Sequence, residues 1–289
     1  MKEVFENGVH HITNENYHYS LGLSRSALWT FKRSPALYWH EYINPDYVKP
    51  QQTPALLLGS MVHSLALEPH TFPEQYTVAR QDTLKKDIEA ANPDLKKKDI
   101  DLLWEAEKDS RELFKIQNSH KTIVTHDLIH QAGAMSSRLH KNDTFMALLD
   151  GAKIEQSIYF THERTGLQVK VRPDIWNNDI VGDLKTTDSA APRDFQSSAY
   201  KYGYYLQAGM MHEALRSLGI KMEKFVLPCV EKKEPHLEAL YILDQAAIDY
   251  GINLFNKLMD DYSICLMKDE WPGYGIQSLA LPNYAQYEE

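Results

Sequence analysis

The sequence predicts an α/β fold in which a mainly helical N-terminal part precedes a core built around a β-sheet. Helix-capping residues and apolar residues at helical spacing dominate residues 21–150. Short runs of alternating apolar and polar residues, which are typical of strands, follow, and further helical patterns come after them. No internal repeat or low-complexity linker interrupts the 289 residues. We therefore expect one domain over 1–289, with an extended lead-in at 1–20, helices at 21–150, and the sheet core, its flanking helices and a C-terminal tail at 151–289.

The composition is that of a soluble globular protein, with 43% hydrophobic and 25% charged residues. No apolar run approaches the roughly 18 residues that a membrane-spanning helix needs, and the first residues lack the apolar stretch of a signal peptide. Cys229 and Cys265 are the only cysteines, so we expect neither a disulfide framework nor a four-cysteine zinc or iron–sulfur site. This cysteine usage suits a reducing cytoplasm.

The net charge of −9 weighs mildly against a protein that coats nucleic acid, because such proteins tend to be basic. It does not exclude a nucleic-acid enzyme whose acidic residues gather at a metal site and whose basic residues line a channel. The densest basic cluster comprises Lys85, Lys86 and Lys96–Lys98. A solvated face is the simplest interpretation of these lysines, and a DNA-facing lobe is the alternative.

Two short helices are expected near the N-terminus. Ser24 is a suitable N-cap for the first helix, and Ser34 followed by Pro35 marks the start of the second. The hydroxyl groups of Ser24 and Ser26 and the guanidinium of Arg25 gather at the start of the first helix. A helix N-terminus attracts anions, so this stretch is a weak candidate for a phosphate site.

An apolar helix is predicted to begin after Thr53 and to end at Glu68-Pro69. Helical spacing places Leu56, Gly59 and His63 along one stripe of this helix. From the residues alone, His63 is more readily a core histidine with satisfied hydrogen bonds than a metal ligand.

Two short strands, Val169–Asp174 and Asp179–Thr187, are predicted to pair through a polar turn at Trp176–Asp179. Asp174 ends the first strand. Asp183 and Lys185 lie two residues apart on the second, so their side chains share one face of the sheet. Two carboxylates and a lysine that converge at strand ends suit a divalent cation and a charged substrate. By spacing alone, an exposed strand surface is an equally good interpretation.

The remaining predicted elements frame these two strands. An earlier hairpin turns at Gly166 and, with them, forms a three-stranded antiparallel meander. A long helix that carries Gln207 among several tyrosines follows, and two strands and a last helix complete the core. The expected ranges are Lys153–Phe160 and Leu167–Val171 for the earlier hairpin, Phe195–Leu218 for the long helix, Lys224–Val230 and Leu237–Leu243 for the later strands, and Gln245–Lys268 for the last helix.

Several motifs, taken in order, resemble those of one nuclease family. Arg172-Pro-Asp174 followed by Gly182-Asp183-Leu-Lys185 resembles the signature of the PD-(D/E)xK nuclease superfamily. Leu58–Pro69 resembles the histidine motif of its RecB-like branch. From about Tyr19 to the end, further pieces resemble the nuclease domain of the exodeoxyribonuclease VIII (RecE) type. These pieces are Leu23–Ser26, Ser34–Tyr38, Glu155–Tyr159, Tyr205–Gln207, Asp269–Pro272 and Ser278–Pro282.

This resemblance implies a restriction-endonuclease-like core, in which helices flank a mixed central sheet. It implies an exonuclease that digests linear double-stranded DNA from the 5′ end and leaves 3′ single strands for recombination. The implied cofactor is Mg²⁺, for which Mn²⁺ is expected to substitute. The implied partners are linear duplex DNA, a RecT-like single-strand annealing protein, and further copies of the chain in a ring, with a tetramer favoured. A bacterial or phage-encoded protein of the cytoplasm fits this picture.

The resemblance also assigns roles to individual residues, and it replaces the core-histidine interpretation of His63. The implied metal ligands are His63, Asp174, Asp183 and the backbone carbonyl of Leu184. Lys185 is the implied catalytic lysine, and Gln207 the glutamine that orders the site or the DNA. Ser24, Arg25, Ser26 and Arg172 are implied contacts to a 5′ phosphate or to the DNA backbone.

One departure from the family pattern concerns the helix that carries Gln207. Related enzymes often have a tyrosine four residues after this glutamine, where the present sequence has Met211. Tyr204 or Tyr205 would present a hydroxyl nearby, but from a different face of the helix.

Three alternatives to this nuclease differ in what the site residues would do. A DNA-end-binding protein that has the fold but little or no activity is disfavoured by the intact set of His63, Asp174, Asp183 and Lys185. A Cas4-like or helicase-fused nuclease is disfavoured because the sequence offers neither a four-cysteine cluster nor a Walker A motif. A metallohydrolase that acts on another substrate is suggested only by the acidic balance.

Overall fold

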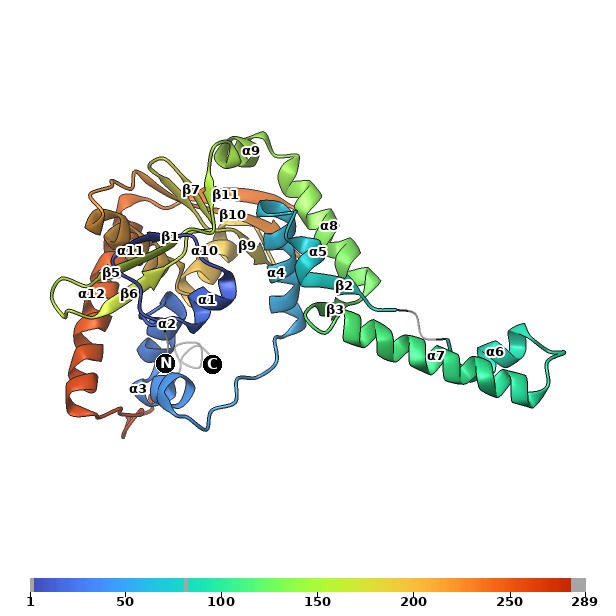
Figure 1. The fold of residues 1–289 in the computed structure, drawn as a ribbon. Coiled ribbons are helices and arrows are strands. Elements are labelled where there is room, and N and C mark those ends of the chain that lie inside the picture. The colour runs from blue at the N-terminus through green and yellow to red at the C-terminus, as the bar shows by residue number, and fades with distance from the viewer. Residues whose placement is uncertain (1–2, 81–82, 282–289) are drawn as a thin grey trace, which may run out of the picture.

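The computed structural model describes residues 3–80 and 83–281 (Figure 1). Pro282, the last residue of the C-terminal motif, lies outside these ranges. The predicted α/β fold is confirmed, with a mixed sheet and helices on both of its faces (Figure 1). None of the helices in the described ranges combines the length and the apolar character that crossing a membrane requires.

The largest sheet has the strand order β11-β10-β8-β7-β4, with β9 also paired to β10. Strands β8 and β9 run parallel to β10, whereas β11 runs antiparallel to β10 and β7 antiparallel to β8. A three-stranded sheet has the order β1-β5-β6, and β2 pairs with β3 apart from both. The strands are β1 (Gly8–His10), β2 (Tyr76–Val78), β3 (Thr122–Val124), β4 (Lys153–Ile154), β5 (Ser157–Thr161), β6 (Gln168–Val171), β7 (Ile175–Asn177), β8 (Ile180–Gly182), β9 (Lys185–Thr187), β10 (Lys224–Glu231) and β11 (Glu238–Ile242).

The expected three-stranded meander is divided between two sheets. Strand β6 pairs with β5, but β7 pairs with β4 and β8, and the chain changes sheet at Arg172–Asp174. Pro173 lies in this break, where a residue without an N–H group cannot continue a ladder of hydrogen bonds. The turn is also tighter than expected, because Trp176 and Asn177 belong to β7 and Asn178 adopts a positive φ of 53°.

Thirteen helical segments surround the sheets. They are α1 (Asn14–Tyr19), α2 (Arg25–Arg33), α3 (Pro35–Tyr38), the π-helical turn η1 (Trp39–Ile43), α4 (Pro54–Leu67), α5 (Phe72–Gln75), α6 (Lys85–Ala91), α7 (Lys97–Gln117), α8 (His126–His140), α9 (Asp143–Leu149), α10 (Pro192–Lys201), α11 (Tyr204–Ser217) and α12 (Gln245–Lys268) in the described residues. The predicted cap at Ser24 is present, because its side chain accepts from the N–H of Ala27. Ser34 precedes α3 as predicted, with Pro35 at the first helical position, but its side chain makes no capping hydrogen bond. Thr53 also caps its helix, by accepting from the N–H of Leu56.

A strand and a short helix occupy much of the range where the sequence predicts an extended lead-in. Strand β1 pairs antiparallel with β5, and Thr13 caps α1 by accepting from the N–H of Asn16. The β1–β5 pairing joins segments about 150 residues apart in the sequence, so no local pattern announces it. This pairing matters for the site because α1 contributes to its wall.

Two apolar cores lie on opposite faces of the large sheet. On β10 the side chains of Phe225, Leu227 and Cys229 pack into one core, whereas Val226 and Val230 pack into the other. This alternation is the period of two of a strand that is buried on both faces. The first core contains α2, α11 and α12, and the second contains α4, α8 and α9.

The long helix expected after the paired strands is two helices, α10 and α11. The chain turns between them at Gly203, whose φ of 74° favours glycine. A Cβ atom at Gly203 would also lie 2.6 Å from the indole ring of Trp29. The break redirects α11 so that Gln207 faces the ends of β8 and β9.

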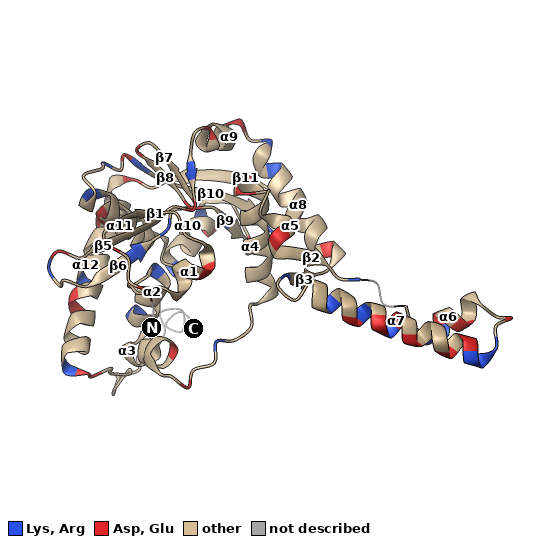
Figure 2. Ribbon diagram, in the orientation of Figure 1, with Lys and Arg blue, Asp and Glu red and all other residues tan. Residues whose placement is uncertain are grey.

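Helices α6 and α7 form an arm that extends away from the body (Figure 1). Acidic and basic side chains alternate along α7 (Figure 2), and Ile100 is its one buried residue in the described chain. Leu102 and Leu113 are 61% and 57% exposed, so the apolar positions of this helix do not form a core. Lys97 and Lys98 begin α7 at the far end of the arm.

We expect the crossing of α11 and α12 to tolerate no side chain at Gly251. A Cβ atom there would lie 1.9 Å from the carbonyl oxygen of Tyr205, which belongs to the helix that carries Gln207. Gly251→Ala should lower the free energy of unfolding by about 1–3 kcal/mol or more, because the backbones must separate. Urea denaturation measures this change.

Gly133→Ala is the matched control, because Gly133 lies within α8 and a Cβ atom there meets nothing within 4 Å. This variant should be as stable as the parent or more stable by about 0.5–1 kcal/mol, the usual difference between alanine and glycine in a helix. Equal stabilities for the two variants would contradict the close crossing.

Candidate active site

One cavity of about 270 Å³ collects the residues that the sequence predicts for the site. Its walls come from α1, the N-terminus of α2, α4, β6, the break between β8 and β9, and α11. The predicted residues that line it are Ser24, Arg25, Ser26, His63, Arg172, Asp174, Asp183, Lys185 and Gln207. The structure thus brings together groups that are separated by up to 183 residues along the chain.

His63, Glu155 and Asp174 form one cluster of possible metal ligands. Each residue offers one ligand atom, and these atoms lie within 4.8 Å of one another. The Nδ1 atom of His63 is 3.4 Å from the Oδ2 atom of Asp174. One imidazole nitrogen and two carboxylates are a donor set that Mg²⁺, Mn²⁺ and other divalent cations accept, so these residues fit such an ion.

Glu155 is the ligand candidate that sequence reasoning missed. It belongs to one of the motifs behind the family resemblance, but its role does not follow from that motif. The backbone of Glu155 has a φ of 52°, and its N–H donates to the carbonyl oxygen of Asp174 at 3.2 Å. This irregular stretch between β4 and β5 turns the carboxylate toward the cavity, a change of direction that no strand pattern predicts.

The surroundings of Glu155 disfavour its ionised form unless a cation is beside it. Burial, and then the negative charge of Asp174, raise the pKa of Glu155 to about 8. Arg172 opposes this shift, and its Nε donates to the Oε2 atom of Glu155 at 2.6 Å. Arg172 therefore neutralises a ligand candidate, in addition to lining the cavity as predicted.

Asp183, Lys185 and Gln207 form a second cluster beside the first. Lys185 makes an ion pair with Asp183 through Oδ2, and Gln207 donates from Nε2 to Oδ1 of the same carboxylate. The Nζ of Lys185 also donates to the Oε1 atom of Gln207 at 3.4 Å. Both oxygens of Asp183 are thereby engaged, so its contribution to a metal site would require these contacts to rearrange.

The chain is locally irregular between β8 and β9, and this irregularity places the side chains of Asp183 and Lys185. Asp183 and Leu184 interrupt the strand between β8 and β9, opposite Leu227 and Pro228 in the register of β10. Leu184 is fully buried and donates its N–H to the Oδ2 atom of Asp174 at 2.7 Å. The metal-ligand role of its carbonyl stays a prediction.

Lys185 is buried beside two carboxylates and one guanidinium group. Burial lowers its pKa to about 7, with Arg25 acting in the same direction and Asp174 against it. Its Nζ also lies 4.7 Å from the ring centroid of Tyr204. A lysine with a pKa near neutrality holds or releases a proton readily at physiological pH.

The contact with Tyr204 changes how the departure at Met211 is interpreted. Met211 lines the cavity together with Met210, so the position four residues after Gln207 is at the site but carries no hydroxyl. Tyr204 begins α11, and the break at Gly203 brings its ring to Lys185. The tyrosine expected from a different helix face thus reaches the site because the long helix is broken.

The start of α2 forms the basic side of the cavity. The hydroxyl groups of Ser24 and Ser26 form a hydrogen bond at 3.1 Å. The Nη1 of Arg25 donates to the carbonyl oxygen of Tyr202 at 3.3 Å. Burial lowers the pKa of Arg25, whose guanidinium faces the cavity. The nine-residue helix directs its free N–H groups toward the same space, which suits an anion.

Lys170 is a further cavity residue without a role in the sequence-based prediction. This buried lysine donates from Nζ to the carbonyl oxygens of Tyr17 and Ser20, at 2.6 and 2.7 Å. It thereby fastens the end of α1 to β6 and shapes the wall of the site. The pKa of Tyr17 is raised above its usual range, mainly by burial.

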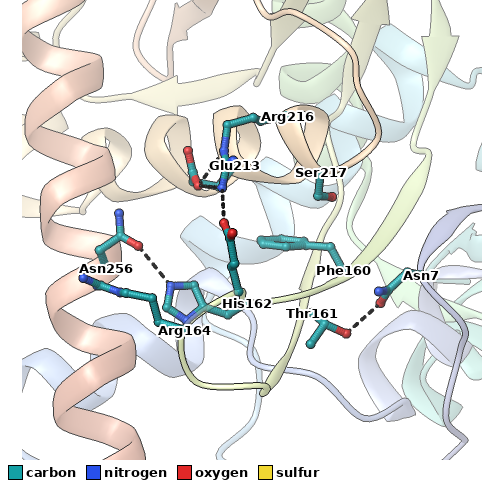
Figure 3. A pocket seen from close by; sticks show the side chains of 10 residues that line it. Asn7, Phe160, Thr161, His162, Arg164, Glu213, Arg216, Ser217 and Asn256 are labelled. Atoms are coloured by element: carbon teal, nitrogen blue, oxygen red, sulfur yellow. Dashed lines mark hydrogen bonds and ion pairs between the residues drawn. The ribbon is translucent and has the colours of Figure 1, made fainter.

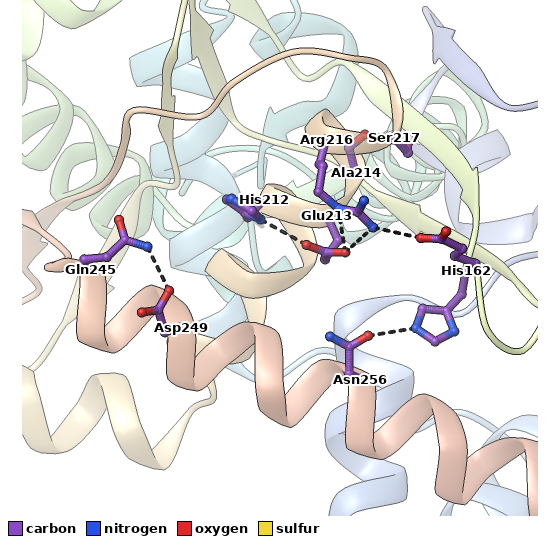
Figure 4. Close-up of polar contacts among 10 residues, drawn as sticks. His162, His212, Glu213, Ala214, Arg216, Ser217, Gln245, Asp249 and Asn256 are labelled. Carbon is purple, nitrogen blue, oxygen red and sulfur yellow. Dashed lines mark hydrogen bonds and ion pairs between the residues drawn. The ribbon is translucent and has the colours of Figure 1, made fainter.

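A larger cavity of about 580 Å³ lies elsewhere and contains none of the predicted site residues (Figure 3). The Nε2 atom of His162 hydrogen-bonds to the Oδ1 atom of Asn256 at 3.0 Å. Arg216 donates to Glu213 at 2.8 Å and reaches Glu163, so the charged groups neutralise each other (Figure 4). We interpret these contacts as a junction that holds the β5–β6 turn against α11 and α12.

Comparisons with known proteins agree with the fold. A protein family described as "PDDEXK-like domain of unknown function (DUF3799)" matches residues 24–279. No curated protein matches the chain.

Solved structures add a fold comparison. A protein from Eubacterium rectale, whose crystal structure is described as that of a "Putative exonuclease", superposes with a TM-score of 0.61 at 15% identity. The alignment covers 96% of the present chain and 99% of that protein. The crystal structure of SSO0001 gives a TM-score of 0.27 at 16% identity over 72% of this chain and 85% of that one. The first of these shares the fold over nearly the whole chain, and no conclusion rests on the second.

We predict that Asp174→Asn weakens the binding of Mn²⁺ by at least about tenfold, because even the partners of metal ligands contribute that much. Asp174 is the carboxylate that His63 and Glu155 both approach. Asp179→Asn, in the exposed turn of the same hairpin, should leave the affinity unchanged. Calorimetric titration with Mn²⁺ measures both, and equal affinities would contradict this metal site.

Proposed function

We propose that this chain, which belongs to the family of PDDEXK-like domains, is a nuclease that requires a divalent metal and digests linear duplex DNA from the 5′ end. The observation that carries the proposal is the composition of one cavity. It combines the ligand cluster around Asp174, the cluster of Asp183, Lys185 and Gln207, and the basic N-terminus of α2. These are the parts that metal-assisted hydrolysis of a phosphodiester needs.

Mg²⁺ is the proposed ion, and Mn²⁺ the proposed substitute. His63, Glu155 and Asp174 would hold this cation, which would supply positive charge against the charge that develops on the scissile phosphate. Two carboxylates and one imidazole nitrogen fit such an ion, and Asp183 would be a fourth ligand if Lys185 turned toward the phosphate.

The residues of the chain have separate tasks in this mechanism. Lys185 donates a hydrogen bond to a phosphate oxygen and orients the attacking water, and its pKa of about 7 allows it to exchange a proton during the reaction. The side-chain amide of Gln207 hydrogen-bonds to both Asp183 and Lys185 and so fixes the relative positions of their side chains. After hydrolysis, the cleaved end of the strand leaves the site.

The 5′ polarity follows from the proposed position of the terminal phosphate. Arg25 and the N–H groups at the start of α2 bind an anion near Lys185. A 5′ phosphate held there would place the next phosphodiester at the metal cluster. Digestion from this end leaves a 3′ single strand, the product expected from the exodeoxyribonuclease VIII resemblance. A ring-like oligomer, an annealing protein as partner and a place in cytoplasmic recombination stay predictions of that resemblance.

A DNA-end-binding protein without activity is the second candidate function. The engagement of both Asp183 oxygens by Lys185 and Gln207 favours it, because this arrangement leaves three rather than four ligands for a metal. The two candidates differ in one measurable outcome, which is the loss of nucleotides from linear DNA in the presence of Mg²⁺.

We expect the protein with Mg²⁺ to release a 5′ label from linear duplex DNA before a 3′ label, and to leave closed circular duplex DNA intact. Asp183→Ala and Lys185→Ala should each reduce the rate by about 10²–10³-fold, the usual effect of removing one group that stabilises developing charge. A gel assay with strand-specific labels measures both predictions.

Lys221→Ala is the control for these variants, because Lys221 is 79% exposed and pairs with Glu223 away from the cavity. Its rate should equal that of the parent. Undiminished digestion by both site variants would refute the assigned roles, and earlier release of the 3′ label would refute the polarity. Binding of DNA ends without digestion would favour the second candidate.

A further inference from the structure

Residues 44–53 connect η1 to α4 as a long, isolated segment, which we call the strap. All strap residues except Asn44 and Tyr47 are exposed, and Val48 is 85% exposed. In Figure 1 the strap runs from the α3 side of the molecule to α4 with no other element beside it. Ten residues exceed the usual length of about two to eight for a connection between packed helices. Pro45 and Pro50 restrict its backbone.

The strap joins two walls of the proposed nuclease site. The N-terminus of α2 lines the cavity through Ser24–Ser26, and α3 and η1 continue from the same helix toward the strap. Helix α4 lines the cavity through His63, and the strap enters it at Pro54. Figure 1 shows α1, α2 and α3 on one side and α4 on the other. The strap therefore connects these two walls by a stretch of chain whose residues are not part of the cavity lining.

Electrostatic effects connect the middle of the strap, and the helical turn before it, with residues that line the cavity. Burial, and then the ammonium group of Lys49, lower the pKa of His18, which lines the cavity. Burial lowers the pKa of Arg25, and the phenol groups of Tyr204 and Tyr42 oppose this shift. Tyr42 belongs to η1 at the start of the strap, and Lys49 lies in its middle.

The side chains at the strap suit a single nucleic-acid strand. Trp39 and Tyr42 on η1 are each 39% exposed, and Tyr42 stacks on Tyr38 with the rings 8° from parallel. Tyr47 lies with its ring 5.1 Å from that of His40. Lys49 adds a cation. Exposed aromatic rings beside a basic residue are the combination that binds bases and phosphates without regard to sequence.

We propose that residues 44–53 form a strap under which one DNA strand passes on its way to the site, so that the chain accepts only a strand with a free end. This inference rests on the proposed function, because DNA is the substrate in both. An internal segment of a closed strand cannot enter a closed ring of protein unless that ring opens. The strap would thus account for digestion from ends, and it would retain the strand between successive cleavages.

Opening the strap tests this topology. The recognition sequence of a site-specific protease is inserted between Gln51 and Gln52, and the folded protein is then cut there. The matched control carries the same insertion between Pro93 and Asp94, in the exposed turn at the far end of the α6–α7 arm. Circular dichroism before and after cutting verifies that both proteins stay folded.

The probe is a duplex with a hairpin at one end and a single-stranded 5′ tail that ends in biotin. The proteins carry Asp183→Asn and are studied with Mg²⁺, so that the strand is held but digestion is suppressed. Streptavidin is added either before or after the protein, and dissociation into excess salt is followed by fluorescence anisotropy.

With an intact strap, streptavidin added first should prevent loading. Streptavidin added after loading should slow dissociation by at least about tenfold, because the strand is then mechanically retained. Cutting the strap should remove both effects, whereas cutting the arm should leave them unchanged. The strap proposal would be overturned if the intact protein bound and released the DNA equally well whether streptavidin was added before or after it.

The second measurement uses the same proteins without Asp183→Asn, so that digestion can proceed. With Mg²⁺, the uncut protein should digest a linear duplex that carries a single-stranded 5′ tail and leave single-stranded circles intact, whereas the cut strap should allow circles to be attacked. Digestion of circles by the uncut protein would overturn the strap while leaving the nuclease in place. Failure of every form to bind or digest linear DNA would instead overturn the proposed function, and the strap proposal with it.

Discussion

The carboxylate of Asp174 is the point on which the site depends. Its Oδ2 atom accepts the N–H of Leu184 and lies beside the imidazole of His63. Its backbone carbonyl accepts the N–H of Glu155. One residue therefore ties together the break after β6, the interrupted strand between β8 and β9, helix α4, and the irregular backbone before β5. All of these segments except the regular helix α4 depart from regular structure where they meet Asp174, as functional sites often require.

The cost of burying charge explains why so many of these contacts are shared. Asp174 and Asp183 are 8% and 3% exposed, and a carboxylate removed from water is stable only when it is paired or hydrogen-bonded. Asp183 meets this condition through Lys185 and Gln207, and Glu155 through Arg172. The same contacts hold the site in shape before a metal or substrate arrives, although Asp183 can bind a metal only after its contacts with Lys185 and Gln207 rearrange.

The sequence predicted the parts of this arrangement that local rules determine. The cap at Ser24, the start of a helix after Thr53 and the strand at Lys224–Val230 depend on neighbouring residues, and the structure has them. The role of Glu155 could not be predicted, because it depends on a positive φ and on a carboxylate nineteen residues away. The change of sheet after Val171 and the pairing of β1 with β5 likewise depend on long-range contacts, which no local pattern encodes. His63 was identified through a resemblance between motifs, not through its own spacing.

The acidic net charge is compatible with a nucleic-acid substrate once the charges are located. Four cations, Arg25, Lys170, Arg172 and Lys185, line the cavity with three carboxylates, although the whole chain carries −9. Charges in a cleft with walls of low dielectric constant act on a ligand more strongly than charges on an exposed surface, which water and salt screen. Those exposed charges include the alternating acids and bases of the α6–α7 arm (Figure 2). Because a divalent cation would add two further positive charges to the same cavity, the local field would favour a phosphate while the surface stays acidic. An acidic surface would also repel DNA elsewhere, so strands would bind where this cavity receives them.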